Sequence, residues 1–160
     1  MTLIADATAL ILLSKVGMLE KLTNRNKVVI PERVYEEVVK GKEKGRLDSL
    51  IVEKLVQEKK IIIKACKVAD RIEKTFRLRG GELEVISLAY PKETVLSDDK
   101  KCLNVAKALG MDFITSPDVV VALQKNGTIT REDARDCIDG LEEYGWYSRE
   151  LIKKYLEELK

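Results

Sequence analysis

The sequence predicts an α/β protein with a three-layer α/β/α arrangement, in which helices cover both faces of a central, mainly parallel sheet. Short apolar runs that look like strands alternate with amphipathic stretches along the whole chain. The 160 residues fit one domain, spanning 1–160, without an internal repeat or a composition shift. The segment from about 126 to 160 is expected to form extra C-terminal helices that pack on this domain.

The first half of the chain predicts three strands and their connecting helices. Asp6 or Thr8 can cap the helix that follows the first strand. Pro31 stops the second strand and suits the first position of the next helix. The β-branched run at 61–63 is typical of a strand. We expect strands at 3–5, 28–30 and 61–63, and helices at 9–15, 18–22, 32–40 and 47–58.

The second half continues the alternation and ends in helices. Gly80 and Gly81 open a helix that Pro91 ends, and Gly110 stands where a helix C-terminus favours glycine. Two amphipathic helices close the chain and are hinged at Gly145. We expect strands at 94–96 and 113–114, and helices at 68–77, 82–89, 100–109, 117–125, 131–143 and 148–159.

Composition excludes several kinds of chemistry. The chain has no histidine, which removes Ser–His and Cys–His catalysis and His-ligated zinc. Cys66, Cys102 and Cys137 lack metal-ligand or disulfide spacing and are expected to be buried, reduced side chains. The 29 Lys and Arg nearly balance the 27 Asp and Glu, so net charge alone neither favours nor excludes nucleic acid.

The same composition bears on location and source. No apolar run is long enough to span a bilayer, and no signal peptide precedes the first strand, so we expect a cytoplasmic protein without membrane attachment. Abundant Lys and Glu with few aromatic residues indicate a thermophilic source.

Carboxylates follow two of the predicted strands directly, at the edge where parallel sheets bind ligands. Asp6 follows the first strand, Asp98 and Asp99 follow the strand at 94–96, and Glu82 starts a helix behind two glycines. Taken singly, each acid can be a helix cap or a complement to a helix dipole. Capping does not require the acids to gather at one edge, however. A divalent cation would relieve their repulsion, and oxygen-only ligands suit Mg²⁺ or Mn²⁺.

Four segments in the same order resemble the PIN-domain family, in particular its small prokaryotic, VapC-like branch with G-E-x-E-A-I-x-L-A and D-D-x-x-x-R-x-x-A patterns. They are IADATALILLSKVGML, PERVYEEV, RGGELEVISLA and VLSDDKKCLNVAKALG, and they span about residues 2–125. The resemblance implies a PIN-like fold. It also implies an endonuclease that hydrolyses RNA phosphodiester bonds with one or two Mg²⁺ or Mn²⁺ ions.

The resemblance also assigns roles to residues. The implied catalytic and metal-binding acids are Asp6, Glu37, Glu82 and Asp99. Asp98 is a neighbouring metal ligand or helper, and Thr8 and Ser97 occupy hydroxyl positions that we assign to substrate binding. One departure is Leu103, which stands where the branch has an arginine, and this puts substrate handling in question.

The family pattern P-x-x-V-x-x-E selects Glu37 rather than Glu36 as the second acid. Glu82 and Glu84 are about 200° apart around a helix, so only one of them can face the site. The glutamates not selected, Glu36 and Glu84, are expected to be solvated helix surface.

An acidic cleft repels RNA, so a basic rim should guide the substrate. Arg79 and Lys100 adjoin the motif acids and are assigned to substrate binding. The other rim candidates are Lys40, Lys42, Lys44, Arg46, Arg77 and Lys101. A homodimer is also expected, because the C-terminal helices carry much apolar surface, at Leu141, Trp146, Tyr147, Leu151, Ile152, Tyr155 and Leu156.

Other interpretations stay open. A receiver-like signalling domain also has an acidic pocket at its strand ends, but its acid pair follows the first strand, where this chain has Asp6 alone. A phosphatase with D-x-D is disfavoured because Thr8 replaces the second acid. A PIN fold could also bind RNA or protein without catalysis. A nuclease could be the toxin of a toxin–antitoxin pair with an antitoxin partner, a processing enzyme, or neither.

Overall fold

The computed structural model describes residues 1–43, 46–145 and 147–160, with the backbone alone at 41–43. Three residues named above, Lys42, Lys44 and Trp146, therefore fall outside the described side chains. Within the described ranges the sheet has five strands in the order β3-β2-β1-β4-β5, and every neighbouring pair is parallel. The strands are β1 (Thr2–Ala5), β2 (Lys27–Pro31), β3 (Ile61–Lys64), β4 (Thr94–Leu96) and β5 (Phe113–Ile114).

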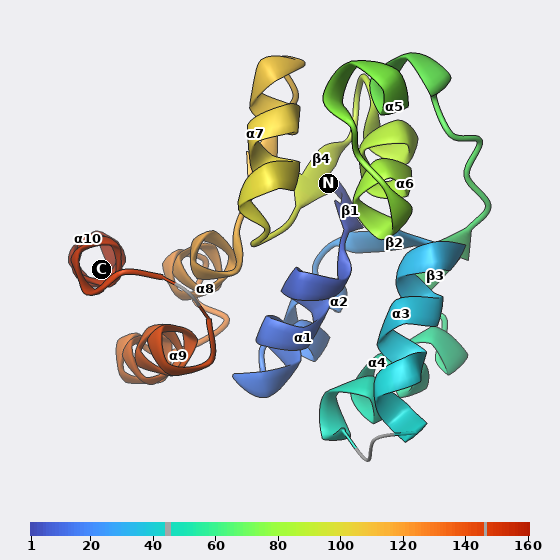
Figure 1. The fold of residues 1–160 in the computed structure, drawn as a ribbon. Helices are drawn as coiled ribbons and strands as arrows, with labels where there is room; N and C mark the ends of the chain where they lie inside the picture. The colour runs from blue at the N-terminus through green and yellow to red at the C-terminus, as the bar shows by residue number, and fades with distance from the viewer. Residues whose placement is uncertain (44–45, 146) are drawn as a thin grey trace.

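Helices surround the sheet, which confirms the predicted three-layer α/β/α fold (Figure 1). Figure 1 shows α8, α9 and α10 as a group of their own at the left of the view. The helices are α1 (Ala7–Lys15), α2 (Leu19–Thr23), α3 (Glu32–Glu43), α4 (Leu47–Gln57), α5 (Asp70–Phe76), α6 (Gly80–Ala89), α7 (Lys100–Ala108), α8 (Ser116–Lys125), α9 (Arg131–Tyr144) and α10 (Arg149–Glu158).

Several local expectations were wrong, and among them α3 extends to Glu43 rather than ending at residue 40. Pro31 is the last residue of β2 and pairs with Lys64, which is tolerated because a proline at a strand end removes only a terminal ladder donor. Helix α5 begins at Asp70 rather than at residue 68. Cys66 is only half-buried, whereas Cys102 and Cys137 are buried as expected.

The hydrophobic core contains the apolar side chains of the strands and also side chains of the C-terminal helices. The side chains of 3–5 in β1 and 28–30 in β2 are all buried. Leu141 and Ile152 are fully buried as well, and Tyr147, Tyr155 and Leu156 are partly buried against the core. Most of the apolar surface on which the homodimer expectation depended is therefore covered within the chain. Among the described residues, no helix is both long and apolar enough to cross a membrane.

Candidate active site

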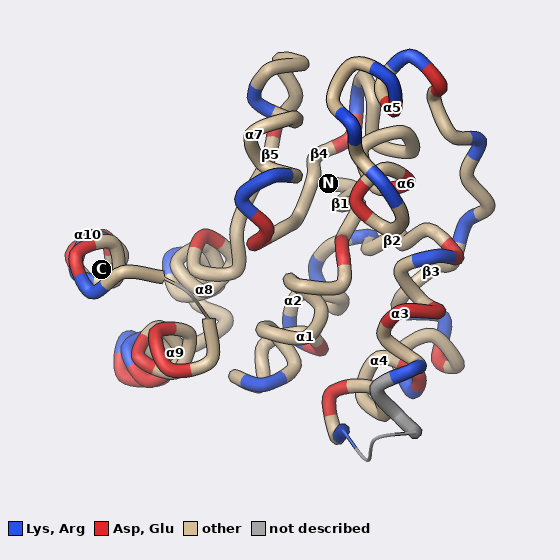
Figure 2. Tube along the Cα trace, viewed as in Figure 1, with Lys and Arg blue, Asp and Glu red and all other residues tan. Residues whose placement is uncertain are grey.

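Asp6 and Asp99 lie at the carboxyl ends of neighbouring strands. β1 lies between β2 and β4, and its residue Ala5 pairs with Leu96 of β4. The backbone N–H of Asp6 donates to the carbonyl oxygen of Leu96 at 3.1 Å, which continues the pairing past the strand end. Figure 2 shows acidic residues at the starts of α1, α6 and α7, with basic residues beside them at α6 and α7.

Asp6 is buried and held on both carboxylate oxygens. Its Oδ1 accepts from the Thr8 hydroxyl at 2.6 Å and from the Ala9 backbone N–H at 3.0 Å, so Asp6 caps α1. Its Oδ2 accepts a hydrogen bond from the Ser97 hydroxyl. Burial raises the pKa of Asp6 to about 6, although these three hydrogen bonds act in the opposite direction. The side chain is thus fixed in orientation but held where its charge is unfavourable.

Thr8 and Ser97, which we assign to substrate binding, both donate hydrogen bonds to Asp6. The Ser97 hydroxyl is fully buried and also accepts from the Asp99 backbone N–H at 3.0 Å. The Thr8 hydroxyl accepts from the Asp98 backbone N–H at 3.0 Å. The two hydroxyls therefore join the turn after β4 to the acid after β1, and their observed contacts are with these protein groups.

Asp99 and Asp98 point to different surroundings. The Asp99 Oδ2 accepts from the Cys102 backbone N–H at 2.8 Å and caps α7, while the side chain stays partly exposed. Asp98 is only 4% exposed. It accepts hydrogen bonds from the backbone N–H and hydroxyl of Ser116 and from the Tyr147 hydroxyl. Metal binding by Asp98 would require some of these bonds to break.

Glu37 reaches the N-terminus of α6 through a gap that only glycine leaves open. Its Oε1 accepts from the backbone N–H of Gly81 at 3.0 Å. A Cβ on Gly81 would lie 2.8 Å from Oε2 and 2.9 Å from Oε1 of Glu37, so alanine there would displace the carboxylate. Gly80 has a φ of +57°, a conformation that favours glycine. The structure thus gives a physical reason for glycine at both positions: space for the Glu37 carboxylate at Gly81 and a positive φ at Gly80.

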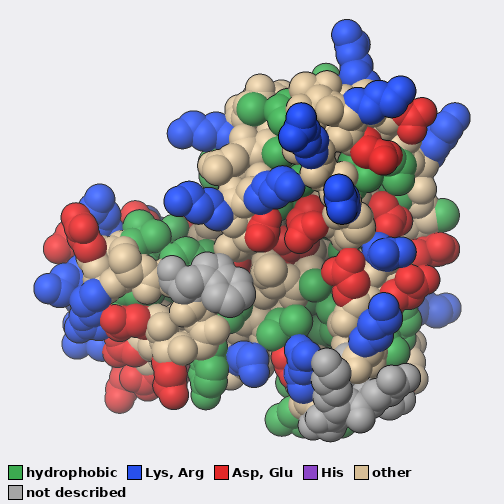
Figure 3. Space-filling view, viewed as in Figure 1, with side chains coloured by type: hydrophobic (Ala, Val, Ile, Leu, Met, Phe, Trp, Pro, Cys, Tyr) green, Lys and Arg blue, Asp and Glu red, His purple; other side chains and the backbone are tan. Residues whose placement is uncertain are grey.

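Glu82 connects the other acids electrostatically. Its pKa is raised by burial first, and then by the negative charges of Asp99 and Glu37. The buried Cys102 thiol has its pKa raised by burial and by the charges of Asp6, Asp99 and Glu82. The four predicted acids therefore act on one small region around the starts of α6 and α7. In Figure 3, acidic side chains gather in the middle of this face, with lysine and arginine side chains close around them.

Exposed basic side chains border the starts of α6 and α7. Arg79 is the exposed residue before α6, and Lys100 is the exposed first residue of α7. Lys101 is also exposed, and its Nζ donates to the Arg77 carbonyl oxygen at 3.1 Å. Sequence reasoning missed Arg33, whose Nε lies 3.9 Å from the Glu37 Oε1. The four-residue spacing of an arginine before Glu37 on one helix was the available signal.

The donor chemistry suits a hard divalent cation, but the side chains do not form a closed cage. Asp6, Glu37, Glu82 and Asp99 offer oxygen atoms alone, as Mg²⁺ and Mn²⁺ prefer. Among the residues that the structure describes, no group of three acidic or thiol side chains is close enough to hold a metal ion. Burial raises the pKa of Glu82 most, and the charges of Asp99 and Glu37 raise it further, against a smaller opposite effect of Lys101. The acids thus fit a metal in identity and charge, and would have to close around it.

Comparison with known families agrees with this geometry. A family model described as a PIN domain matches residues 2–160, nearly the whole chain and further than the segments from which we recognised the resemblance. A search among curated proteins finds no match. PIN domains are in general metal-dependent nucleases. The match over nearly all residues, together with the parallel sheet and the acids at its carboxyl edge, shows that the chain belongs to the PIN-domain family.

Proposed function

We propose that this chain is a metal-dependent endoribonuclease that uses Mg²⁺ or Mn²⁺ held by Asp6, Glu37, Glu82 and Asp99. The single observation that carries the proposal is that the charges of Asp99 and Glu37 add to burial in raising the pKa of Glu82, so like charges from three elements gather near the starts of α6 and α7. A protein that used them only as helix caps would gain nothing from placing Glu82 between Asp99 and Glu37. Family membership supports nuclease chemistry, and the missing histidine agrees with catalysis by carboxylates.

In this proposal hydrogen bonds orient three of the four carboxylates before the acids close around a metal. Thr8, Ser97 and the Ala9 backbone N–H hold the Asp6 carboxylate in one orientation. The N-cap bond to Cys102 does the same for Asp99, and the Gly81 N–H does so for Glu37. Such preorganisation lowers the cost of assembling the site around a substrate.

A bound Mg²⁺ or Mn²⁺ would supply Lewis-acid activation of the phosphate and a lower pKa for the attacking water. The exposed Arg79 and Lys100 would attract the phosphates on either side of the scissile bond and offset the repulsion from the acids. Asp98 stays a predicted metal ligand or helper, and in that role its carboxylate would first have to release bonds from Ser116 or Tyr147.

The test is cleavage of RNA by the purified protein. A mixture of unpaired and structured RNAs should be cut in Mn²⁺ or Mg²⁺, and a chelator should abolish the reaction. Activity that survives both the chelator and Asp6→Asn would overturn the metal mechanism. Phosphorylation by a small phosphodonor should fail, and its success would favour the receiver-like alternative.

Whether the enzyme acts as a toxin with an antitoxin partner stays open. The homodimer likewise stays a prediction, which light scattering at tens of micromolar would contradict by giving a monomer mass.

A further inference from the structure

Two open grooves meet at Phe76, beside the acidic site. The first has a volume of about 540 Å³ and runs along α7 from Asp99. The second, of about 460 Å³, continues on the other side of Phe76 between α5 and the ends of α6 and α7. Both volumes fall in the range of ligand sites, about 300–1,000 Å³. Because Phe76 lines both grooves, they form one surface that begins at a proposed catalytic acid.

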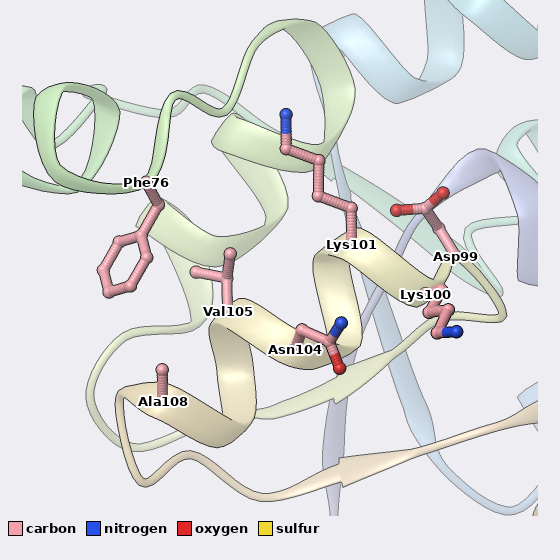
Figure 4. Close-up of a pocket in the computed structure, with 7 residues that line it drawn as sticks. All are labelled: Phe76, Asp99, Lys100, Lys101, Asn104, Val105 and Ala108. Carbon is pink, nitrogen blue, oxygen red and sulfur yellow. The ribbon is translucent and has the colours of Figure 1, made fainter.

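The first groove combines an apolar floor with polar groups. In Figure 4 the Phe76 ring lies beside Val105 and Ala108, and the side chains of Asp99 and Lys101 lie at the other end. Phe76 is only half-buried, so part of its ring can contact a ligand. Asn104 is exposed on the same side of α7 and offers both a donor and an acceptor.

The charges of this surface favour an anion with flat apolar groups. Lys100 and Lys101 line the first groove, and Arg71 lines the second. Lys101 uses one ammonium proton for the Arg77 carbonyl oxygen, which leaves others for a ligand. The second groove adds Tyr90, which is 48% exposed. A surface that combines cations with exposed aromatic rings is the kind that single-stranded nucleic acids bind, by phosphate contacts and base stacking.

We infer that the two grooves form a track for unpaired RNA nucleotides that lead away from the phosphate cleaved beside Asp99. A base stacks on Phe76, its edge meets Asn104, and a following base stacks on Tyr90. Lys100, Lys101 and Arg71 hold the phosphates. This inference depends on the proposed nuclease function and extends it, because it assigns residues outside the acidic site to binding the strand beside the cleaved phosphate. Bases in a duplex face inward and cannot stack on side chains.

Binding of a fluorescein-labelled, unpaired ten-nucleotide RNA, measured by anisotropy, tests the inference. The Asp6→Asn background with Mn²⁺ allows binding without cleavage. Phe76→Leu keeps apolar bulk but loses the ring, and should weaken binding at least about fivefold. Phe76→Tyr should restore it. Phe113→Leu removes another exposed aromatic ring, on β5 and outside both grooves, and should stay within about twofold of the parent.

Asn104→Ala is a second test of the same groove, and because Asn104 is exposed, this variant should fold even if the Phe76 variants do not. It should weaken binding about threefold, the loss of one hydrogen bond. With Asp6 intact, Phe76→Leu should raise KM several-fold and change kcat little, because it removes binding made equally in ground and transition states.

The outcomes separate the two proposals. If the unmutated protein does not cleave RNA, the nuclease proposal fails, whatever Phe76→Leu does to binding. If it does cleave, but Phe76→Leu and Asn104→Ala bind unpaired RNA as the parent does, the track is wrong. Equal weakening on a blunt RNA duplex would also overturn the track.

Discussion

Asp98 and Asp99 are adjacent in sequence, yet their side chains lie on two sides of the turn between β4 and α7 and differ in burial and in hydrogen-bond partners. On the side of α8 and the C-terminal segment, Asp98 is buried and surrounded by donors from Ser116 and Tyr147. On the side of α6, Asp99 is partly exposed, and its charge raises the pKa of Glu82. One carboxylate is held by several hydrogen bonds, although burial still raises its pKa, and the other lies near the like charge of Glu82.

The difference teaches how to separate structural from functional acids in one cluster. A buried carboxylate that accepts from several donors fixes neighbouring elements, here the turn after β4, the start of α8 and the segment before α10. A cluster of like charges that lacks such donors costs stability and persists where a ligand or a reaction needs it. Asp6 and Asp98 each accept several hydrogen bonds, and burial nevertheless raises the pKa of both.

The largest expected effect is on RNA cleavage, which should distinguish substitution of Asp99 from substitution of the adjacent Asp98. Asp99→Asn keeps the N-cap of α7, because asparagine caps helices as well as aspartate does, but removes a proposed metal ligand. It should lower RNA cleavage more than about 100-fold, beyond the loss typical of groups that only orient a metal ligand. Asp98→Asn, the matched control, should lose about tenfold or less. Equal losses would show that the two sides of the turn act alike.

Metal-dependent melting sharpens the same comparison without an activity assay. At about 100 times its dissociation constant, Mn²⁺ should stabilise the folded protein by about 2.7 kcal/mol. For a chain of this size the Tm should rise by about 5–10 °C. The rise should be largely lost in Asp6→Asn, Glu37→Gln, Glu82→Gln and Asp99→Asn.

Glu36→Gln, Glu84→Gln and Asp98→Asn are the controls and should keep most of the rise. If Glu36→Gln or Glu84→Gln abolishes the metal response while Glu37→Gln or Glu82→Gln keeps it, the assignment of the acids is wrong. If no variant or parent responds to metal, the acids are caps and surface charges.

The pH dependence of stability gives the smallest effect and tests Asp6. Burial raises the pKa of folded Asp6 from 3.8 to about 6, so between these values the folded state holds a proton that the unfolded state has released. This contribution stabilises the fold at low pH and is lost as the pH rises through about 6. In chelator, Asp6 should make the protein about 1.4 kcal/mol more stable at pH 5 than at pH 7.5.

Urea unfolding at both pH values measures this difference. Asp6→Asn should show a smaller increase in stability between pH 7.5 and pH 5, and should be at least as stable as the parent at pH 7.5. An unchanged pH dependence would mean that the Asp6 charge is not strained by burial. Asp98→Asn provides the comparison on the closed side of the turn.

Local sequence patterns and the family resemblance predicted which acids belong to the candidate site. The sequence predicts Asp6 and the pair Asp98–Asp99 either as helix-cap residues or as strand-end acids, and the structure shows that Asp6 and Asp99 are the caps. Capping and metal binding were weighed as alternatives, yet a cap can use one oxygen and leave another, as with Asp99. The role of Ser97 could not be predicted from its neighbours in sequence, because its partner Asp6 follows a different strand. Thr8 lies two residues from Asp6, but its second partner, the Asp98 backbone N–H, is also far away in the chain.

The sequence by itself determined the alternation of elements, the all-oxygen chemistry and the position of each acid along the chain. Periodicity and capping are local, so they can be read within a few residues. Only the tertiary structure decided which acids meet. It placed Glu37 on the N-terminus of α6, turned Asp98 toward Tyr147, and brought Phe76 beside α7. These contacts join segments far apart in the chain, and their energies depend on burial and on neighbouring charges that no local pattern contains.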